Sequence, residues 1–131
     1  MPTKHPAHER GANIVEAAFV IPLLLIMLVG VVDMGRAYYT YISIINAARE
    51  GARWGVMHPT DNGGMCAKAT AEALTNTPPV NLICLPPQTP NGVVSGAPVR
   101  VTVQANFSTI LGSIVGISAF PISYSVAFPI F

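Results

Sequence analysis

An uninterrupted apolar run near the amino terminus dominates the pattern of the sequence. Between residues 12 and 32 the only strongly polar side chains are Asn13 and Glu16. At 1.5 Å per residue, a helix over this run would be about 31 Å long, close to the thickness of a bilayer's hydrocarbon core. The run predicts one membrane-spanning helix, in which Pro22 favours a kink that membrane helices tolerate when neighbouring groups rescue the freed carbonyl.

A cleavable secretory signal is the alternative interpretation of this run, because Lys4 and Arg10 form a basic flank before it. The run is longer than the apolar region of a signal, and it lacks a small-x-small cleavage site before Asp33, which favours a retained helix. The two basic residues favour a cytoplasmic amino terminus, but Arg36 near the other end of the run keeps this bias weak.

The helical pattern continues beyond the apolar run. Apolar residues recur at spacings of three and four, which is typical of one face of a helix. They are Met34, Tyr38, Tyr41, Ile45, Ala48 and Ala52. We expect one helix over residues 13–56, ended by His58 because the residue before Pro59 is disfavoured in a helix.

Small residues also recur at every fourth position in the second half of this helix, at Ala47, Gly51 and Gly55. Such spacing lets another backbone come close to the helix. The neighbour is either a helix of another chain or a strand or loop of the same chain, and the spacing alone favours neither.

Shorter elements separated by turns are predicted for the distal half. Residues 61–64 form a turn cluster, and the alanine-rich residues 66–74 predict a short helix that ends before two prolines. Residues 80–85 predict one short strand. Residues 86–98 contain four prolines and predict an exposed loop.

Alternation with a period of two predicts two longer strands, at residues 99–107 and 122–128. Residues 110–117 between them predict a compact turn or a single helical turn. A second membrane span over residues 110–131 is the alternative, since that stretch has no charge. Its prolines, serines and alternation favour a sheet, because an isolated strand could not satisfy its backbone in lipid.

These elements predict an α+β fold, with a long amino-terminal transmembrane helix that continues into a small extracytoplasmic domain with an antiparallel sheet. The chain divides into a basic leader at 1–11, the transmembrane part of the helix at 12–32, its extramembrane part at 33–57 and the small domain at 58–131.

Composition and charge narrow the function classes. Of the 131 residues 51% are hydrophobic and 10% are charged, against roughly 25% charged in an ordinary soluble domain. Five charged residues of each sign follow Gly11 without a basic stripe, which argues against a nucleic-acid partner. The sequence lacks a metal-ligand constellation, a phosphate loop, a nucleophile elbow and a local carboxylate pair, so we expect neither an enzyme nor a cofactor or metal.

Cys66 and Cys84 are the only cysteines in the chain. The predicted topology places both outside the cytoplasm, where disulfides persist. We expect a bridge between them, which the chain-entropy model values at about 3 kcal/mol. Two buried free thiols are the alternative, and a metal site is disfavoured because no histidine follows His58.

Glu16 is the candidate functional side chain inside the apolar run. A carboxylate in a membrane span is costly, and such residues usually find a partner or mark a functional position. The alternative is that Glu16 lies at the headgroup boundary and is hydrated there.

Three stretches of the chain carry a family resemblance. They are residues 10–16 (RGANIVE) before the apolar run, residues 33–37 (DMGRA) and residues 46–53 (NAAREGAR). Together with the valine-rich strand, the apolar connection and the final strand, they resemble the TadE-like family of tight-adherence pilus assembly proteins over the whole chain. Two features depart from the family's pattern: Ala17, where relatives commonly carry an aromatic residue, and the apolar end at residues 128–131.

The resemblance implies a pilin-like protein whose basic leader is removed by a prepilin peptidase after a glycine, with a glutamate as fifth residue of the mature chain. Gly11, Ala12 and Glu16 fit that register, so cleavage would fall between Gly11 and Ala12. Glu16 would then pair with the new amino terminus of Ala12 on a neighbouring subunit. This pair would set the axial register, because a buried ammonium and carboxylate together cost far less than either alone.

The expected function is that of a non-enzymatic minor pilin in assembly of a tight-adherence type IV pilus or related filament. The expected partners are membrane lipid, the prepilin peptidase and other pilin-like subunits bound through the long helix. The expected location is the bacterial cytoplasmic membrane or a cell-surface filament. An accessory single-pass subunit of another membrane complex is the alternative.

Overall fold

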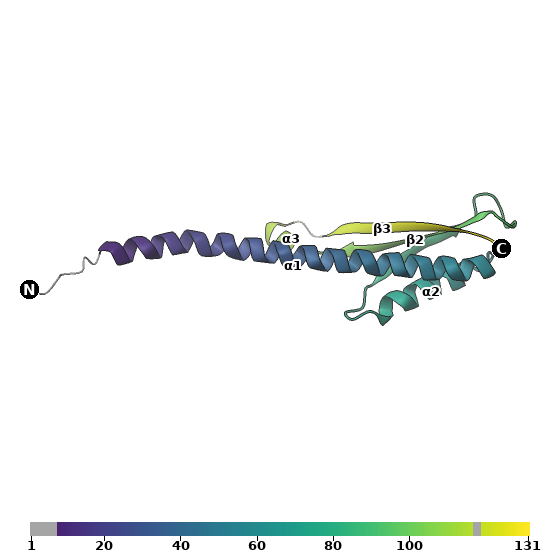
Figure 1. Cartoon of the computed structure of the whole chain (residues 1–131), viewed down its shortest axis with the longest axis horizontal. Coiled ribbons are helices and arrows are strands. Elements are labelled where there is room, and N and C mark those ends of the chain that lie inside the picture. Colours follow the sequence, from purple (N-terminus) through teal and green to yellow (C-terminus); the bar gives the residue numbers. More distant parts are fainter. Residues whose placement is uncertain (1–7, 117–118) are drawn as a thin grey trace, which may run out of the picture.

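A computed structural model describes residues 8–116 and 119–131, and it shows one long helix with a small domain packed on its second half (Figure 1). The elements follow in the order α1 (His8–Met57), α2 (Asn62–Thr75), β1 (Leu82–Gln88), β2 (Pro98–Phe107), α3 (Ile110–Val115) and β3 (Phe120–Pro129). The α+β class and the antiparallel sheet are therefore confirmed.

Helix α1 contains 50 residues and is about 75 Å long at 1.5 Å per residue. It begins at His8, five positions before the predicted start, so residues 8–11 of the predicted leader are helical, while residues 1–7 lie outside the described part of the chain. It continues through Pro22 and ends at Met57. The His58 amide still donates to the Trp54 carbonyl at 3.0 Å, and Pro59 stops the helix there.

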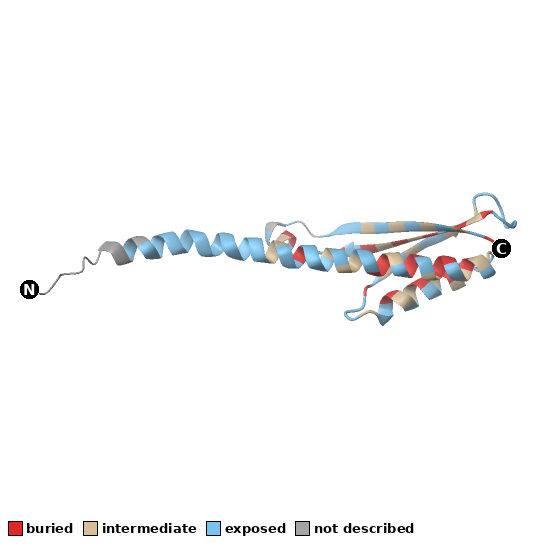
Figure 2. Cartoon of the chain, in the orientation of Figure 1, coloured by how far each residue is buried: buried red, intermediate tan, exposed pale blue. Residues whose placement is uncertain are grey.

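The described parts of the chain cover mainly the second half of α1 (Figure 2). The predicted helix over 13–56 is confirmed. Of the stripe that predicted it, Met34 is 76% exposed and Tyr38 is 67% exposed, whereas Ala48 and Ala52 are fully buried. The residues of the covered face are Ile44, Ala47, Ala48, Gly51, Ala52 and Gly55. The spacing of apolar residues predicts a helix, but it does not show where along the helix the covering domain begins.

The three strands form one antiparallel sheet in the order β1-β2-β3. The residues of β2 alternate between buried and solvent-facing positions, and Val99, Val101 and Val103 are fully buried. Val101 lies opposite Val126 and Val103 opposite Tyr124 in β3. The two strands predicted from alternation are confirmed, as is the single helical turn between them, which is α3.

Helix α2 begins four residues before the prediction, because Asp61 caps it. An oxygen of the Asp61 carboxylate accepts from the Gly64 amide at 2.8 Å, so the glycines of the predicted turn form the first turn of α2. Strand β1 also extends beyond its prediction, into the expected loop at 86–98. It includes Pro86 and Pro87, which are tolerated because β1 is an edge strand whose pairing is irregular between Leu85 and Gln88.

The core lies between one face of the sheet and two helices. Helix α1 packs over β2 and β3, and α2 packs over β1 and beside α1. Among its residues are the small side chains of both helices and the three buried valines of β2. The predicted bridge between Cys66 on α2 and Cys84 on β1 is present, with Cα atoms 5.5 Å apart, and it fixes α2 to the edge of the sheet.

Candidate functional site

The first half of α1 is a bare apolar surface. Every described side chain from Asn13 to Leu28 is exposed, and the largest exposed fraction among the large apolar ones is 78% at Phe19. A surface of this size does not face water in a stable protein. Within residues 8–116 and 119–131, α1 is the one helix long and apolar enough to cross a membrane. It fits a membrane-anchored protein.

The predicted processing and register residues lie together at the start of this surface. Gly11, Ala12 and Glu16 all belong to α1, and Glu16 follows Ala12 by four positions, or about one helical turn. Glu16 is exposed. Among residues 8–116 and 119–131 no side chain or backbone group pairs with its carboxylate, so a partner for Glu16 would have to come from outside these residues.

The small residues predicted for helix packing face the chain's own domain. A side-chain carbon at Gly51 would lie 2.8 Å from the Met65 carbonyl oxygen, and one at Gly55 would lie 2.8 Å from Val99 Cγ1. Ala47 is fully buried. Of the two interpretations left open by the spacing, the structure therefore shows the contact within the same chain, where the glycines let α1 approach α2 and β2.

Asp33 is buried at the junction of the apolar run and the domain. It is 6% exposed. One oxygen of its carboxylate accepts from the Ile110 amide and the other from the Leu111 amide, each at 2.9 Å. Arg36 Nη1 donates to the same carboxylate at 3.0 Å.

Asp33 thereby holds the start of α3. Thr109 Oγ1 accepts from the Gly112 amide at 2.8 Å, so the two side chains together satisfy three amides in the first turn of α3. The backbone amides of Ile110 and then Leu111, followed by Arg36, lower the pKa of the Asp33 carboxyl against the opposing effect of burial. The carboxylate is therefore ionised near neutral pH, which strengthens its hydrogen bonds.

The signal for Asp33 in the sequence was incomplete. A carboxylate directly after an apolar run, three residues before an arginine, indicates an intrahelical ion pair. Its main partners, the amides of Ile110 and Leu111, are 77 and 78 residues away in the chain. No local pattern could have joined them.

A second capping carboxylate lies at the far end of the domain. Trp54 Nε1 donates to Asp61 at 3.1 Å, and the Trp54 ring stacks on His58 with ring centroids 4.2 Å apart. The Gly64 amide and then the Trp54 indole lower the pKa of Asp61. These contacts join the end of α1 to the start of α2. In the part of the chain that the structure describes, no three His, Cys, Asp or Glu side chains gather as metal ligands would.

Part of α1 is similar to a known protein family. Residues 11–53 match the family model for TadE-like protein. This stretch holds the three quoted motifs from Gly11 onward and ends within the covered half of α1, so the resemblance is confirmed there. No curated protein and no solved structure gives a significant match to the chain.

Proposed function

We propose, from the TadE-like character of residues 11–53, that this chain is a pilin-like structural subunit, a minor pilin that takes part in assembly of a tight-adherence pilus or related filament. The observation that carries the proposal is the bare apolar half of α1 with Glu16 near its start. Such a surface can be covered in two ways, by lipid while the chain is in a membrane and by other helices in an assembly.

In the assembly, Glu16 would determine how neighbouring subunits align along their helices. Cleavage between Gly11 and Ala12 would create an ammonium group at Ala12, one helical turn before the glutamate. The Ala12 ammonium of one subunit would pair with the Glu16 carboxylate of its neighbour inside the bundle. Lipid-like surroundings make an unpaired charge costly, so subunits stacked out of register would be disfavoured.

The small domain supports this role by leaving the apolar half free. Its own core uses the second half of α1, and the Cys66–Cys84 bridge holds α2 to the sheet. The amino terminus would be cytoplasmic, with the domain on the opposite side of the membrane. The partners would be the prepilin peptidase, lipid and other pilin-like subunits, with neither a nucleic acid nor a catalysed reaction involved.

Intact mass of the protein from its native membranes and from the sheared surface fraction tests leader removal. A chain that starts at Ala12 in both fractions is the expected result. A chain that keeps Met1 or Pro2 would overturn the processed-pilin mechanism and favour the accessory single-pass subunit.

Substitution of the charged residue tests the register pair. We expect Glu16→Gln to leave processing and membrane insertion intact but to remove the subunit from the sheared fraction. Glu50→Gln, a matched change in the covered half of the same helix, should behave like the wild type. Normal incorporation of Glu16→Gln would contradict the register role.

A further inference from the structure

Helix α3 lies alongside α1 at the end of the apolar run. It extends beyond the ends of β2 and β3, toward the amino-terminal half of α1 (Figure 1). The two hydrogen bonds from its first amides to Asp33 fix this position, because Asp33 directly follows the last residue of the 12–32 run. Along α1 from Asn13, Val29 and Gly30 are the first residues that the rest of the chain partly covers. If α1 crosses a membrane over that run, α3 lies at the membrane surface.

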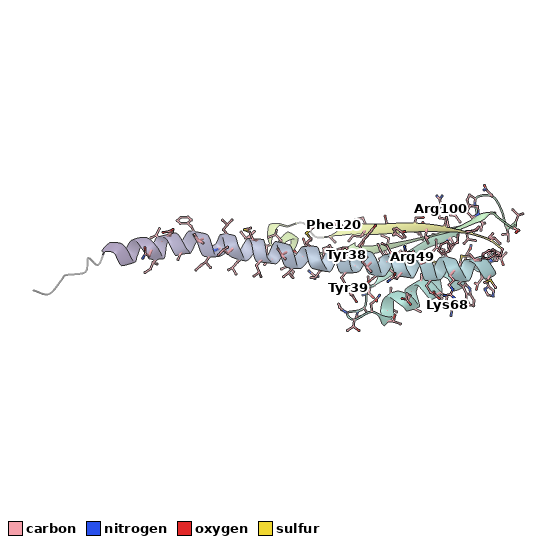
Figure 3. All side chains as sticks on the ribbon, in the orientation of Figure 1. Tyr38, Tyr39, Arg49, Lys68, Arg100 and Phe120 are labelled. Carbon is pink, nitrogen blue, oxygen red and sulfur yellow. A yellow bond between two sulfur atoms is a disulfide. The ribbon has the colours of Figure 1, made fainter. Side chains whose placement is uncertain are left out.

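Among the described residues of α3, the large exposed side chains are apolar, and the exposed Ser113 hydroxyl donates to the Ile110 carbonyl at 2.6 Å. Ile114 is 75% exposed and Ile110 is 42% exposed, and Phe120 at the start of β3 is 44% exposed. No charged residue follows Arg100 in the sequence. Arg49, Lys68 and Arg100 lie farther from α3 than Phe120 does (Figure 3).

Arg36 lies just beyond the point where the apolar run of α1 meets the domain. It is three residues beyond Asp33 along α1, and its side chain is 45% exposed while it donates to the Asp33 carboxylate. Its guanidinium also lies over the Phe107 ring, 5.4 Å from the centroid. A cation just above an apolar segment is the arrangement found where a protein meets lipid headgroups.

We propose that α3 is an interfacial membrane anchor, with Ile110 and Ile114 in contact with the acyl chains of the leaflet from which the domain emerges. The occupant of this surface is lipid, because α3 packs beside α1 at Asp33, where the apolar run of α1 ends. Asp33 is the positioning residue that sets this depth. The domain would then be attached at two points, which restricts its tilt against the membrane.

This inference needs α1 to span the bilayer but does not need the chain to be a pilin. It is tested with the full chain in phosphatidylcholine vesicles. Both native cysteines are bridged, so Ile114→Cys gives one free thiol for a nitroxide spin label. Matched variants are Leu25→Cys in the apolar run and Val94→Cys in the domain, which are 57% and 59% exposed.

Accessibility to oxygen, which partitions into lipid, is compared with accessibility to a water-soluble nickel chelate. We expect the label at 114 to resemble the label at 25, with an oxygen-to-nickel ratio several-fold above that at 94. A ratio at 114 equal to that at 94 would overturn the anchor. Protection at 114 from both reagents would overturn lipid as the occupant and indicate a second protein chain. A label at 25 that behaves like the label at 94 would overturn insertion of α1 itself.

The role of Asp33 is tested in the same labelled chain. Adding Asp33→Ala should release α3, lower the oxygen-to-nickel ratio at 114 and increase the mobility of the label. Asp61→Ala removes the other capping carboxylate, at the far end of the domain, and should leave both readings at 114 unchanged. An unchanged ratio in the Asp33→Ala chain would contradict its positioning role.

Discussion

The two halves of α1 are both apolar but differ in the size of their residues. The half before Asp33 is rich in leucine, isoleucine and valine, together with Phe19, and these side chains are exposed. The covered face after it is built mainly from alanine and glycine, with Ile44 as its large member. Lipid adapts to large side chains, whereas packing against a fixed backbone of the same chain needs small ones. Residue size therefore distinguishes a surface meant for other molecules from one meant for the chain's own core.

The largest expected effect comes from removing the Cys66–Cys84 disulfide of the domain that covers the second half of α1. The double variant Cys66→Ser/Cys84→Ser should lower the free energy of unfolding of the domain by about 3 kcal/mol, because an 18-residue separation is no longer closed in the unfolded chain. Denaturant unfolding followed by near-UV circular dichroism measures this loss. Membrane insertion of the first half should not change, and loss of insertion would show that the two halves are not independent.

A smaller effect is expected from one added methyl group in the covered half. Gly51→Ala places a carbon 2.8 Å from the Met65 carbonyl oxygen, so we expect the domain to lose about 2 kcal/mol through overpacking. Gly35→Ala is the control on the same helix. No atom of the described residues lies within 4 Å of its added carbon, so the stability of this variant should stay equal or rise by up to about 1 kcal/mol from helix propensity. Equal effects of the two substitutions would contradict the close packing of α1 on α2.

A pH-dependent effect is expected at the end of the covered half, where Asp61 caps α2. Its pKa is lowered in the folded state by the Gly64 amide and then the Trp54 indole. The ionised carboxylate therefore stabilises the fold above the unfolded pKa, and this contribution is lost as the pH falls through the folded pKa. Asp61→Ala should lower stability at neutral pH, and its difference from the wild type should shrink in acid. Urea unfolding between about pH 7 and about pH 2 measures this, and a difference that grows in acid would refute it.

The smallest effect is expected from truncating the exposed half. Leu24 is 58% exposed, and Leu24→Ala should change the stability of the domain by less than about 0.5 kcal/mol because the side chain touches none of its core. Unfolding in detergent measures this. A loss comparable with that of Gly51→Ala would mean that the first half packs on the domain.

The sequence predicted the features that depend on local pattern. The 12–32 run, the alternation at 99–107 and 122–128 and the bridge between the two cysteines each rest on periodicity, length or residue count, and the structure contains a helix, two strands and a disulfide there. The errors were at boundaries. Asp61 starts α2 earlier than its glycines suggested, and an edge position lets β1 continue through two prolines.

Long-range contacts could not be predicted in this way. The surroundings of Asp33 depend on how α3 returns to α1, and the choice of neighbour for Gly51 depends on where α2 lies. Both were decided by packing between segments far apart in the chain. Glu16 remains a prediction from its position and from the family resemblance, because its expected partner belongs to another molecule.

Because α1 is one continuous helix, it couples rotation of the domain to rotation of the apolar half. Glu16 and Asp33 are 17 positions apart on one helix, which places them about 100° apart around its axis at 3.6 residues per turn. Any rotation of the sheet about that axis turns the glutamate through the same angle. Inserting one residue between them would rotate the glutamate by about 100° relative to the sheet, whereas inserting seven would restore its phase within about 20° and lengthen the rod by about 10 Å. The direction in which Glu16 points from the helix axis is therefore fixed relative to the orientation of the domain.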